Sequence, residues 1–391
     1  MESSKYEKPK SDEHQLAKMR NKRTHIPSLD GLRALAIVLV LLRHAVILYS
    51  RRLDEKQAIV FLDTHWNTFF INGWVGVDLF FVLSGFLIAR PFLQTKRRIP
   101  FKPYILKRIF RIFPAYFFVL IAIVIGAIPY YSYDTTDLWA KLIIHALFLQ
   151  DYGVTDINVV MWSLGVEEKF YLVLPAAFYW LRKRKKGHYQ LLFLFIPILI
   201  APIFRYLTYI GLNNPTDYAV FFKWIRAPFH VCLEPLTLGI IIAFCEYYKW
   251  KPLPAKTTFA VSFMLLIGLL FSHPFLQTIT LYDAVFQPIL IAFIMAGLVY
   301  GAVFGASYWI FTNNLGRFIA KISYSLYLIH WPLFPLSFFI ASSINTTYKV
   351  SPDLTFLVFT LIFSAISIVA AAIQYRYIEK PFLDLKKKRF K

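Results

Sequence analysis

The sequence is divided into apolar stretches of about 20 residues, and this pattern constrains the fold more than any other feature. A helix of that length crosses the roughly 30 Å hydrocarbon core of a bilayer and satisfies its own backbone where water is absent. Mean hydropathy is +0.54 and 58% of the residues are hydrophobic, which is typical of polytopic membrane proteins. We therefore expect an all-α polytopic membrane protein with about ten transmembrane helices. The predicted spans are 29–50, 73–93, 108–128, 160–181, 189–210, 226–247, 256–272, 284–305, 321–341 and 354–376.

One further apolar stretch, residues 138–150, is too short to cross the bilayer comfortably. Counting it as a span would also move the basic run at 182–186 to the outer side, against the charge bias of membrane proteins. We interpret this stretch as a re-entrant or interfacial element.

Basic residues gather on one side of this predicted topology. With the N-terminus inside, 31 of the 43 Lys and Arg residues fall in cytoplasmic segments and 7 in outer ones, so both termini are predicted to be cytoplasmic. Anchoring to anionic lipid accounts for the net charge of +21, so the lipid bilayer is an expected partner and nucleic acid is not. We divide the chain into a cytoplasmic basic tail (1–28), a transmembrane domain (29–378) and a second cytoplasmic basic tail (379–391), with no soluble catalytic domain attached.

Several common kinds of site are not predicted. Cys232 and Cys245 fall in one predicted helix, too far apart for a disulfide, and no His, Cys and Asp set has metal-ligand spacing. No Gly-rich phosphate loop and no GxSxG motif occurs. We therefore expect no metal and look for chemistry among polar residues inside the spans.

Two such residues, Arg33 and His44, lie eleven residues apart in the first span. Eleven steps along an α-helix return to nearly the same face, about 16 Å further along. A cation near the cytoplasmic surface and an imidazole near mid-depth therefore share one helix face. A charge at the bilayer centre costs roughly 3 kcal/mol on insertion scales, so such residues are functional candidates.

Three more arginines are predicted at the cytoplasmic mouth of the same bundle. Arg90 ends the second span, while Arg108 and Arg111 begin the third and share a helix face. Guanidinium groups bind phosphate oxygens well, so this convergence favours a phosphorylated cytoplasmic ligand. Ordinary inside-positive anchoring is the alternative for Arg108 and Arg111.

Carboxylates are predicted on the opposite, outer side of the bundle, where they could bind hydroxyl groups, orient a histidine or pair with a cation. They are Asp78, Glu167, Glu168 and Glu234. Adjacent helix positions point about 100° apart, so Glu167 and Glu168 cannot both face one ligand.

Burial disfavours the charged form of a histidine, so His44 is expected to be neutral, as a general base must be. A packing histidine is the alternative. Neighbouring Arg43 faces elsewhere and is expected to find a carboxylate partner, and His330 is a second histidine within the membrane.

Six segments carry motifs in a familiar order and spacing: LDGLRALAIVLVLLRHA, GWVGVDLFFVLSGFLIAR, KRIFRIFPAY, WSLGVEEKFYLVLP, ISYSLYLIHWPLF and YRYIEKPF. They resemble the acyltransferase family 3 membrane proteins, which O-acylate surface and exported glycans. The resemblance extends from about residue 27 to residue 384. It implies a multi-pass protein of the bacterial inner or plasma membrane, and it makes residues 29–378 an acyltransferase domain.

The resemblance also implies roles for individual residues. The family's Arg-x10-His pattern falls on Arg33 and His44, its Arg-x-x-Arg pattern on Arg108 and Arg111, and the inner arginine of its second helix on Arg90. An acyl-CoA donor, with acetyl-CoA favoured, would bind the last three arginines through its phosphates on the cytoplasmic side. His44 would act as general base or transient acyl acceptor, with Arg33 beneath the thioester.

The acceptor would be a hydroxyl group of a glycan or glycoconjugate, positioned by the outer carboxylates. The sequence departs from the family at Lys169, where a glutamine is usual, and at Glu234, where an aspartate or another polar residue is usual. Polysaccharide, lipid-linked sugar, peptidoglycan and small glycosides all stay open as acceptors.

Two other functional classes are compatible with the composition. A transporter or flippase of a glycan or anionic metabolite would also have many spans and charges within the membrane. It predicts internal repeats, which the two halves do not show convincingly. A receptor or assembly protein without chemistry would leave the convergence of arginines unexplained.

Overall fold

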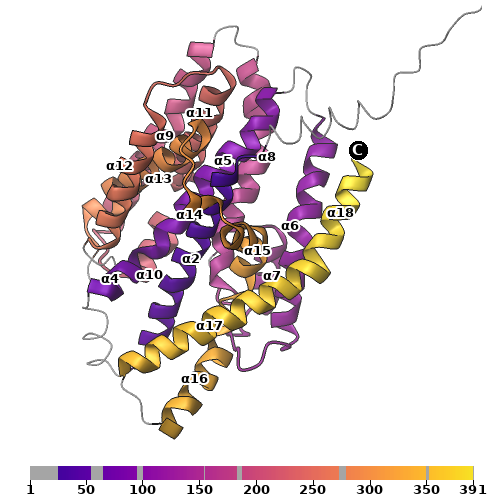
Figure 1. Cartoon of the computed structure of the whole chain (residues 1–391), viewed down its shortest axis with the longest axis vertical. Helices are drawn as coiled ribbons and strands as arrows, with labels where there is room; N and C mark the ends of the chain where they lie inside the picture. Colours follow the sequence, from indigo (N-terminus) through magenta and orange to yellow (C-terminus); the bar gives the residue numbers. More distant parts are fainter. Residues whose placement is uncertain are drawn as a thin grey trace, which may run out of the picture.

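The computed structural model describes residues 25–53, 65–94, 100–153, 155–182, 187–272, 279–348 and 352–390, and these ranges contain helices and no strand (Figure 1). The longer helices are α2 (Pro27–Ser50), α5 (Gly76–Gln94), α6 (Phe101–Val124), α8 (Trp162–Arg182), α9 (Gly187–Gly211), α11 (Leu233–Tyr247), α12 (Ala255–Leu270), α13 (Gln287–Phe304), α15 (Asn314–Ile329), α16 (Phe334–Tyr348), α17 (Pro352–Gln374) and α18 (Lys380–Arg389). The short ones are α4 (His65–Ile71), α7 (Leu138–Ala146), α10 (Tyr218–Phe221) and α14 (Trp309–Thr312). Six 3₁₀ or π turns join them: η1 (Asn72–Val75), η2 (Val159–Met161), η3 (Phe222–Arg226), η4 (Phe229–Val231), η5 (Tyr282–Phe286) and η6 (Tyr375–Glu379).

The described part of the chain has five helices that are long and apolar enough to cross a membrane, or six if one bent pair is a single span. These are residues 27–50, 65–94, 192–211, 282–304 and 354–389. Helices α6 and α8 are long enough but carry more charge, and α12 is shorter. The all-helical membrane fold is thus confirmed, whereas the number of ten spans and the cytoplasmic position of the termini stay predictions. Residues 1–24 of the predicted N-terminal tail lie outside the described ranges.

The predicted span 321–341 is not one straight helix. Helix α15 ends at Ile329, α16 begins at Phe334, and the two helices are bent by 91°. Pro332 explains the break, because it has no backbone N–H to continue the helix and disfavours helical geometry at the preceding residue. His330 lies at this bend.

The predicted span 226–247 also begins differently. Helix α11 starts only at Leu233, and the preceding residues form the π turn η3 and the 3₁₀ turn η4. Pro228 interrupts the helix for the same steric reason. The irregular segment provides polar groups beside the larger cavity described below.

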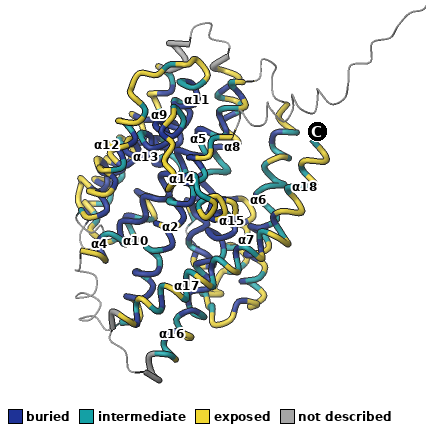
Figure 2. The backbone as a smooth tube through the Cα atoms, viewed as in Figure 1, coloured by how far each residue is buried: buried dark blue, intermediate teal, exposed yellow. Residues whose placement is uncertain are grey.

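Helices α2 and α5 form the buried centre of the molecule, and Figure 2 shows them mostly in dark blue. Helix α11 packs along α5, where Gly85 and Gly239 face each other's backbones. A Cβ atom on Gly239 would lie 2.2 Å from the carbonyl oxygen of Val82, so only glycine permits this approach. Helix α15 packs on the other side of α2.

The C-terminal segment forms a long helical rod, from α17 through the turn η6 into α18, and α18 packs against α6 (Figure 1). The predicted basic tail 379–391 is therefore helical over Lys380–Arg389. Lys386 lies near enough to Arg108 and Arg111 for their charges to repel.

The stretch 138–150 contains α7, a helix of 9 residues, which is too short to span a bilayer. Its outward side chains are apolar, with Trp139 80% exposed and Ile143 58% exposed, while His145 is buried. This arrangement fits the predicted re-entrant or interfacial position.

Candidate active site

Two cavities lie end to end beside α2. The smaller has a volume of about 90 Å³ and is lined by Arg33, and the larger has a volume of about 560 Å³ and is lined by His44. Val77 of α5 and Tyr327 of α15 line both cavities. The Tyr327 hydroxyl is held by Ser163 Oγ at 2.6 Å and by the Val160 carbonyl at 2.7 Å. The side chains of Val77 and Tyr327 therefore form the wall between the two cavities.

The smaller cavity gathers two of the predicted arginines around a carboxylate. Arg33 of α2 and Arg111 of α6 line it together with Glu167 of α8. Glu167 accepts hydrogen bonds from Ser84 Oγ at 3.0 Å and from the Tyr171 hydroxyl. Neither guanidinium group forms an ion pair within 4.0 Å with a carboxylate of the described residues, so both are available to an anionic ligand.

Arg108 lies at the edge of this group. Its guanidinium group stacks over the rings of Tyr104 and Tyr171, at 5.7 and 5.2 Å from the ring centroids. Together with Lys386 of α18, it makes the mouth beside Arg111 strongly cationic.

Three other arginines form ion pairs with carboxylates: Arg90 with Glu246 at 2.7 Å, Arg226 with Asp78 at 2.7 Å, and Arg205 with Glu234. The last pair is almost fully buried, with side chains 3% and 1% exposed. Arg90 therefore does not join the Arg33 group, and Glu234 is held by a cation of its own protein.

The two adjacent glutamates lie elsewhere than predicted. Glu167 and Glu168 were expected with Asp78 on the outer side, but Glu167 lines the Arg33 cavity and Glu168 lies near Arg108. The prediction failed because α8 packs beside α5 and α6 with its first turns deep in the bundle. Glu168 Oε1 is buried and has no hydrogen-bond partner among the residues that the structure describes.

Lys169, a departure from the family motif, has a structural partner. Its ammonium group binds Asp151 at 2.5 Å and the Phe148 carbonyl at 2.6 Å. It ties α8 to the turn after α7 and does not line either cavity.

His44 forms a hydrogen-bonded pair with His330, the histidine at the bend between α15 and α16. His44 Nδ1 and His330 Nε2 are 2.8 Å apart, and His330 Nδ1 is 3.0 Å from the Leu326 carbonyl oxygen. A carbonyl only accepts, so His330 Nδ1 carries a proton and its Nε2, in the neutral ring, accepts from His44 Nδ1–H. Neutral His44 then has an unprotonated Nε2, as a general base or nucleophile needs.

The larger cavity around His44 has aromatic walls and cationic groups. Trp74, Trp162 and Trp331 are among its lining residues, and the Trp331 ring meets His44 edge-on at 5.1 Å. Arg226 also lines it, with its guanidinium group 4.9 Å from the centre of the Trp74 ring. Asp78 thus lies near this cavity through its ion pair with Arg226.

Arg43 does not have the carboxylate partner that we expected. Its guanidinium group donates to the Ile71 carbonyl and, at 2.9 Å, to the Tyr218 hydroxyl, and it lines the larger cavity. It forms no ion pair with a carboxylate in the described ranges. The hydrogen-bond partners of Arg43 are thus neutral groups of α4 and α10, and not the carboxylate that we predicted.

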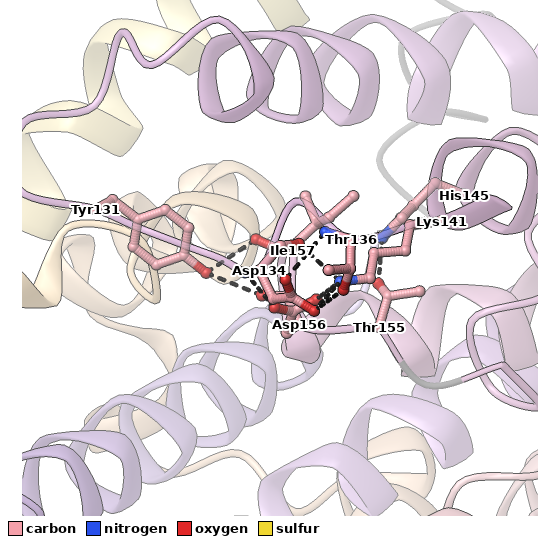
Figure 3. Close-up of polar contacts among 8 residues, drawn as sticks. All are labelled: Tyr131, Asp134, Thr136, Lys141, His145, Thr155, Asp156 and Ile157. Carbon is pink, nitrogen blue, oxygen red and sulfur yellow. Dashed lines mark hydrogen bonds and ion pairs between the residues drawn. The ribbon is translucent and has the colours of Figure 1, made fainter. Parts of the chain in front are cut away.

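A polar clasp, formed by Tyr131, Asp134, Lys141 and Asp156, ties the loop between α6 and α7 to residues 156–157 (Figure 3). Lys141 Nζ lies 2.8 Å from Asp156, and the Tyr131 hydroxyl donates to the Ile157 carbonyl at 2.9 Å. Hydrogen bonds from Thr136 lower the pKa of Asp134 to about 2. Asp156 is itself part of the cavity wall, so the clasp positions that wall.

His145 of α7 contacts the same wall through Thr155 (Figure 3). Burial lowers the pKa of His145 to about 4, so the ring is neutral at pH 7. Its nitrogens lie 2.8 Å from the Tyr116 hydroxyl and 2.7 Å from Thr155 Oγ1. Thr155 also lines the cavity.

No group of three or more His, Cys, Asp or Glu side chains within the described part of the chain is placed to hold a metal ion.

A family model described as an acyltransferase domain, that of acyltransferase family 3, matches residues 26–376. The chain belongs to this family. The match covers both cavities and all nine predicted site residues, from Arg33 to Glu234.

Relatives of this chain come from bacteria. An O-acetyltransferase of unproven activity from Staphylococcus aureus (strain COL) is 29% identical over 386 residues, which cover 92% of this chain and 58% of the relative. The peptidoglycan O-acetyltransferase OatA of Listeria monocytogenes is 25% identical over 349 residues, covering 81% and 51%. The O-acetyltransferase OatA of S. aureus (strain NCTC 8325) is 26% identical over 415 residues, covering 97% and 60%. The chain thus spans between half and three fifths of their length, and no solved structure matches it significantly.

Two features of the site were missed in the sequence. His330 was recognised as a histidine within the membrane but not as the partner of His44, from which it is 286 residues distant in the chain. Tyr327, three residues earlier, was not predicted as a site residue. Their i, i+3 spacing on one helix face was a usable signal, because it places both beside the same neighbouring helix.

Proposed function

We propose that this protein is a membrane O-acyltransferase that moves an acyl group, with acetyl as the first candidate, from acyl-CoA to a hydroxyl group of a surface or exported glycan. One observation carries the proposal: an imidazole with an unprotonated Nε2 lies in one cavity, and a second cavity behind the same wall is lined by arginines that form no ion pair with a carboxylate of the described residues. Family membership and the bacterial relatives support it, and they favour the bacterial cell membrane as its location.

The donor would approach from the Arg33 side. A cavity of about 90 Å³ has room for the narrow pantetheine arm but not for a nucleotide. The arm would pass between Val77 and Tyr327 to bring the thioester to His44. The phosphates of acyl-CoA would therefore lie at the mouth, near Arg108, Arg111 and Lys386. Arg90 would act indirectly, by holding α5 against α11 through Glu246.

The acceptor would occupy the larger cavity, where indole rings offer flat apolar faces to a sugar. Asp78 would act through Arg226, whose position it fixes. Glu167 would serve the donor side, by orienting Arg33 and Arg111.

The chemical step follows from the tautomer of His44. Its Nε2 takes the proton of the acceptor hydroxyl while the hydroxyl oxygen attacks the thioester carbonyl carbon. The carbon–sulfur bond breaks, and the leaving thiolate takes the proton back from Nε2. In the two-step alternative, Nε2 attacks the thioester carbonyl carbon and the coenzyme thiolate leaves. The acceptor hydroxyl oxygen then attacks the carbonyl carbon of the acyl-imidazolium, the bond to Nε2 breaks, and the hydroxyl proton passes to the thiolate.

Thiol release tests this function. Purified full-length protein is incubated with acetyl-CoA and peptidoglycan or polysaccharide fragments, and free coenzyme thiol and acetyl ester are both measured. We expect equal amounts of each from the wild type and none from His44→Ala. Acceptor transport without thiol release would instead support a flippase, and retained turnover in His44→Ala would remove the histidine from the mechanism.

A single-turnover experiment separates the two chemical routes. Protein is mixed with radiolabelled acetyl-CoA without acceptor and then denatured rapidly. Label bound to the wild type but not to His44→Ala would establish the two-step route. Absence of bound label, with turnover intact, would establish the one-step route.

A further inference from the structure

The charges of the larger cavity reveal more about the acceptor than the family does. We propose that the acceptor carries a negatively charged group, a carboxylate or a phosphate, on the sugar unit that is acylated or on the adjacent one. This inference rests on the proposed function, because it takes the His44 cavity as the acceptor site.

The cavity wall has more positive than negative charge. Four cations line it, namely Arg43, Arg51, Lys223 and Arg226, against a single carboxylate, Asp156. Two of these charges are already compensated from outside the wall. Arg226 is paired with Asp78, and Asp156 is paired with Lys141.

Three cations are left without a carboxylate partner among the residues that the structure describes: Arg43, Arg51 and Lys223. Arg43 is the most informative, because only 4% of its surface is exposed. Its hydrogen-bond partners within the described ranges are a carbonyl and a phenol, and neither carries a negative charge to compensate it. A buried charge without a counter-ion is expensive, so a bound anion would stabilise this arrangement.

The three cations come from separate parts of the fold and meet around one space. Arg43 and Arg51 lie eight residues apart on α2 and the turn after it, so they are about 12 Å apart along the helix axis and about 80° apart around it, and both line the cavity. Lys223 belongs to the π turn η3 and lines the same cavity from there. Arg51 and Lys223 are exposed, so they would attract an anion at the entrance, while Arg43 would hold it inside.

The position of His44 limits how far the charge can be from the reacting hydroxyl. His44 follows Arg43 directly and lines the same cavity of about 560 Å³. A space of this size holds about two sugar units beside the histidine. A negative group that reaches Arg43 therefore belongs to the acylated unit or to its neighbour.

A matched set of small sugars tests the proposal without turnover. Methyl glucoside, methyl glucuronide and methyl glucoside 6-phosphate differ only at carbon 6. This position is a neutral hydroxymethyl group in the first sugar, a carboxylate in the second and a phosphorylated hydroxymethyl group in the third. Binding to full-length protein in a neutral detergent without phospholipid is measured from the rise in the thermal unfolding midpoint and from indole fluorescence. We expect one or both anionic sugars to bind about 10-fold more tightly than the neutral one, and the advantage to shrink as salt screens the charges.

Variants identify which cations are responsible. Arg51→Gln and Lys223→Gln should each reduce the anionic preference about threefold and leave the neutral sugar unaffected. Arg52→Gln is the matched control, since Arg52 adjoins Arg51 in the chain but packs over Phe334 and Phe338, outside the cavity lining. It should behave like the wild type.

Four results would overturn the inference. Equal binding of the three sugars, or no binding of either anionic one, would show that the cations do not select an acceptor. A preference that disappears in phosphatidylglycerol nanodiscs would assign the cations to lipid headgroups. A rise in the KM for acetyl-CoA in Lys223→Gln would assign them to the donor. Loss of thiol release with every acceptor, by contrast, would refute the enzyme function itself and leave the binding result standing.

Discussion

At the scale of single residues, His44 depends on His330 for its protonation pattern. The hydrogen bond of 2.8 Å between the two rings leaves Nε2 of His44 without a proton. We predict that His330→Leu lowers kcat roughly 100-fold, with little change in the KM for acetyl-CoA, because the base loses its tautomer but the donor site is intact. Steady-state thiol release measures both constants.

The conservative variant distinguishes this role from simple packing. His330→Gln keeps an oxygen that can accept from His44 Nδ1–H, so it should retain clearly more activity than His330→Leu. Both variants should elute as monodisperse protein with similar unfolding midpoints. Equal kcat in the two variants would show that the hydrogen bond is not what matters.

Paired and unpaired arginines should respond differently to substitution. We predict that Arg33→Gln raises the KM for acetyl-CoA about 10-fold, because its charge has no carboxylate partner within 4.0 Å among the described side chains. Arg90→Gln should mainly lower thermal stability, because it leaves Glu246 without its partner at 2.7 Å. A larger increase in the KM for acetyl-CoA in Arg90→Gln than in Arg33→Gln would contradict the proposed donor site.

The sequence was sufficient to select Arg33 and His44 as candidates, because a charged or polar residue in an apolar span is conspicuous. The structure places each of them in the lining of a cavity, and their roles stay predictions. It was insufficient for their partners. Glu246 lies 156 residues from Arg90, and Asp78 lies 148 residues from Arg226. Such ion pairs depend on which helices become neighbours, which the spacing of residues along one helix does not determine.

At the scale of elements, the contact between α5 and α11 depends on glycine. We predict that Gly239→Val lowers the unfolding free energy by about 1–3 kcal/mol, because even a Cβ atom would lie 2.2 Å from the Val82 carbonyl oxygen. Thermal unfolding in detergent measures the loss. Gly268→Ala is the control, since a Cβ atom there meets nothing within 4 Å, and it should leave stability nearly unchanged. Similar midpoints for the two variants would argue against this packing.

The polar clasp should weaken only in strong acid. The pKa of Asp134 is lowered from 3.8 to about 2, chiefly by the Thr136 hydroxyl. A carboxyl group with a depressed pKa stabilises the fold above its ordinary value, and that contribution is lost as the pH falls through its folded value. We predict that hydrogen-exchange protection of the Asp134 amide, which donates to Asp156, is constant from pH 7 to about 4 and falls between about 4 and 2.

Substitution of the clasp lysine provides the control for that experiment. Lys141→Met should lower the protection at all pH values, because Lys141 bridges Asp134 and Asp156. Lys387→Met, which breaks an exposed ion pair with Asp384 on α18, should leave the hydrogen-exchange protection of the Asp134 amide unchanged. Protection that already falls near pH 6 would contradict the assigned pairing.

Helix positions were predictable where hydrophobic length decides them, and helix breaks were not. The first span was predicted at 29–50 and forms Pro27–Ser50, because nothing in its interior interrupts the backbone. The spans at 226–247 and 321–341 both contain prolines that apolar composition hides, at Pro228 and Pro332. Apolar length measures the ability to cross a bilayer, whereas continuity of a helix depends on backbone hydrogen bonds.

At the scale of the whole molecule, the central claim is that one imidazole is reached by the donor from one side of the protein and by the acceptor from the other. Arg33 lies near the start of α2, His44 and Arg51 lie toward its end, and the Val77–Tyr327 wall stands between the two cavities. Val77→Trp would thicken this wall. Val38→Trp is its matched control, because Val38 is 40% exposed and lines neither cavity.

Sealed proteoliposomes test this claim most directly. Acetyl-CoA is supplied only outside and an acceptor oligosaccharide only in the lumen, and both coenzyme thiol and acetylated sugar are measured. The account predicts thiol outside and acetyl ester inside in equal amounts. Both products should be unchanged in Val38→Trp, reduced at least about 10-fold in Val77→Trp and absent in His44→Ala. Acetylation that occurs only when donor and acceptor share one compartment would contradict it.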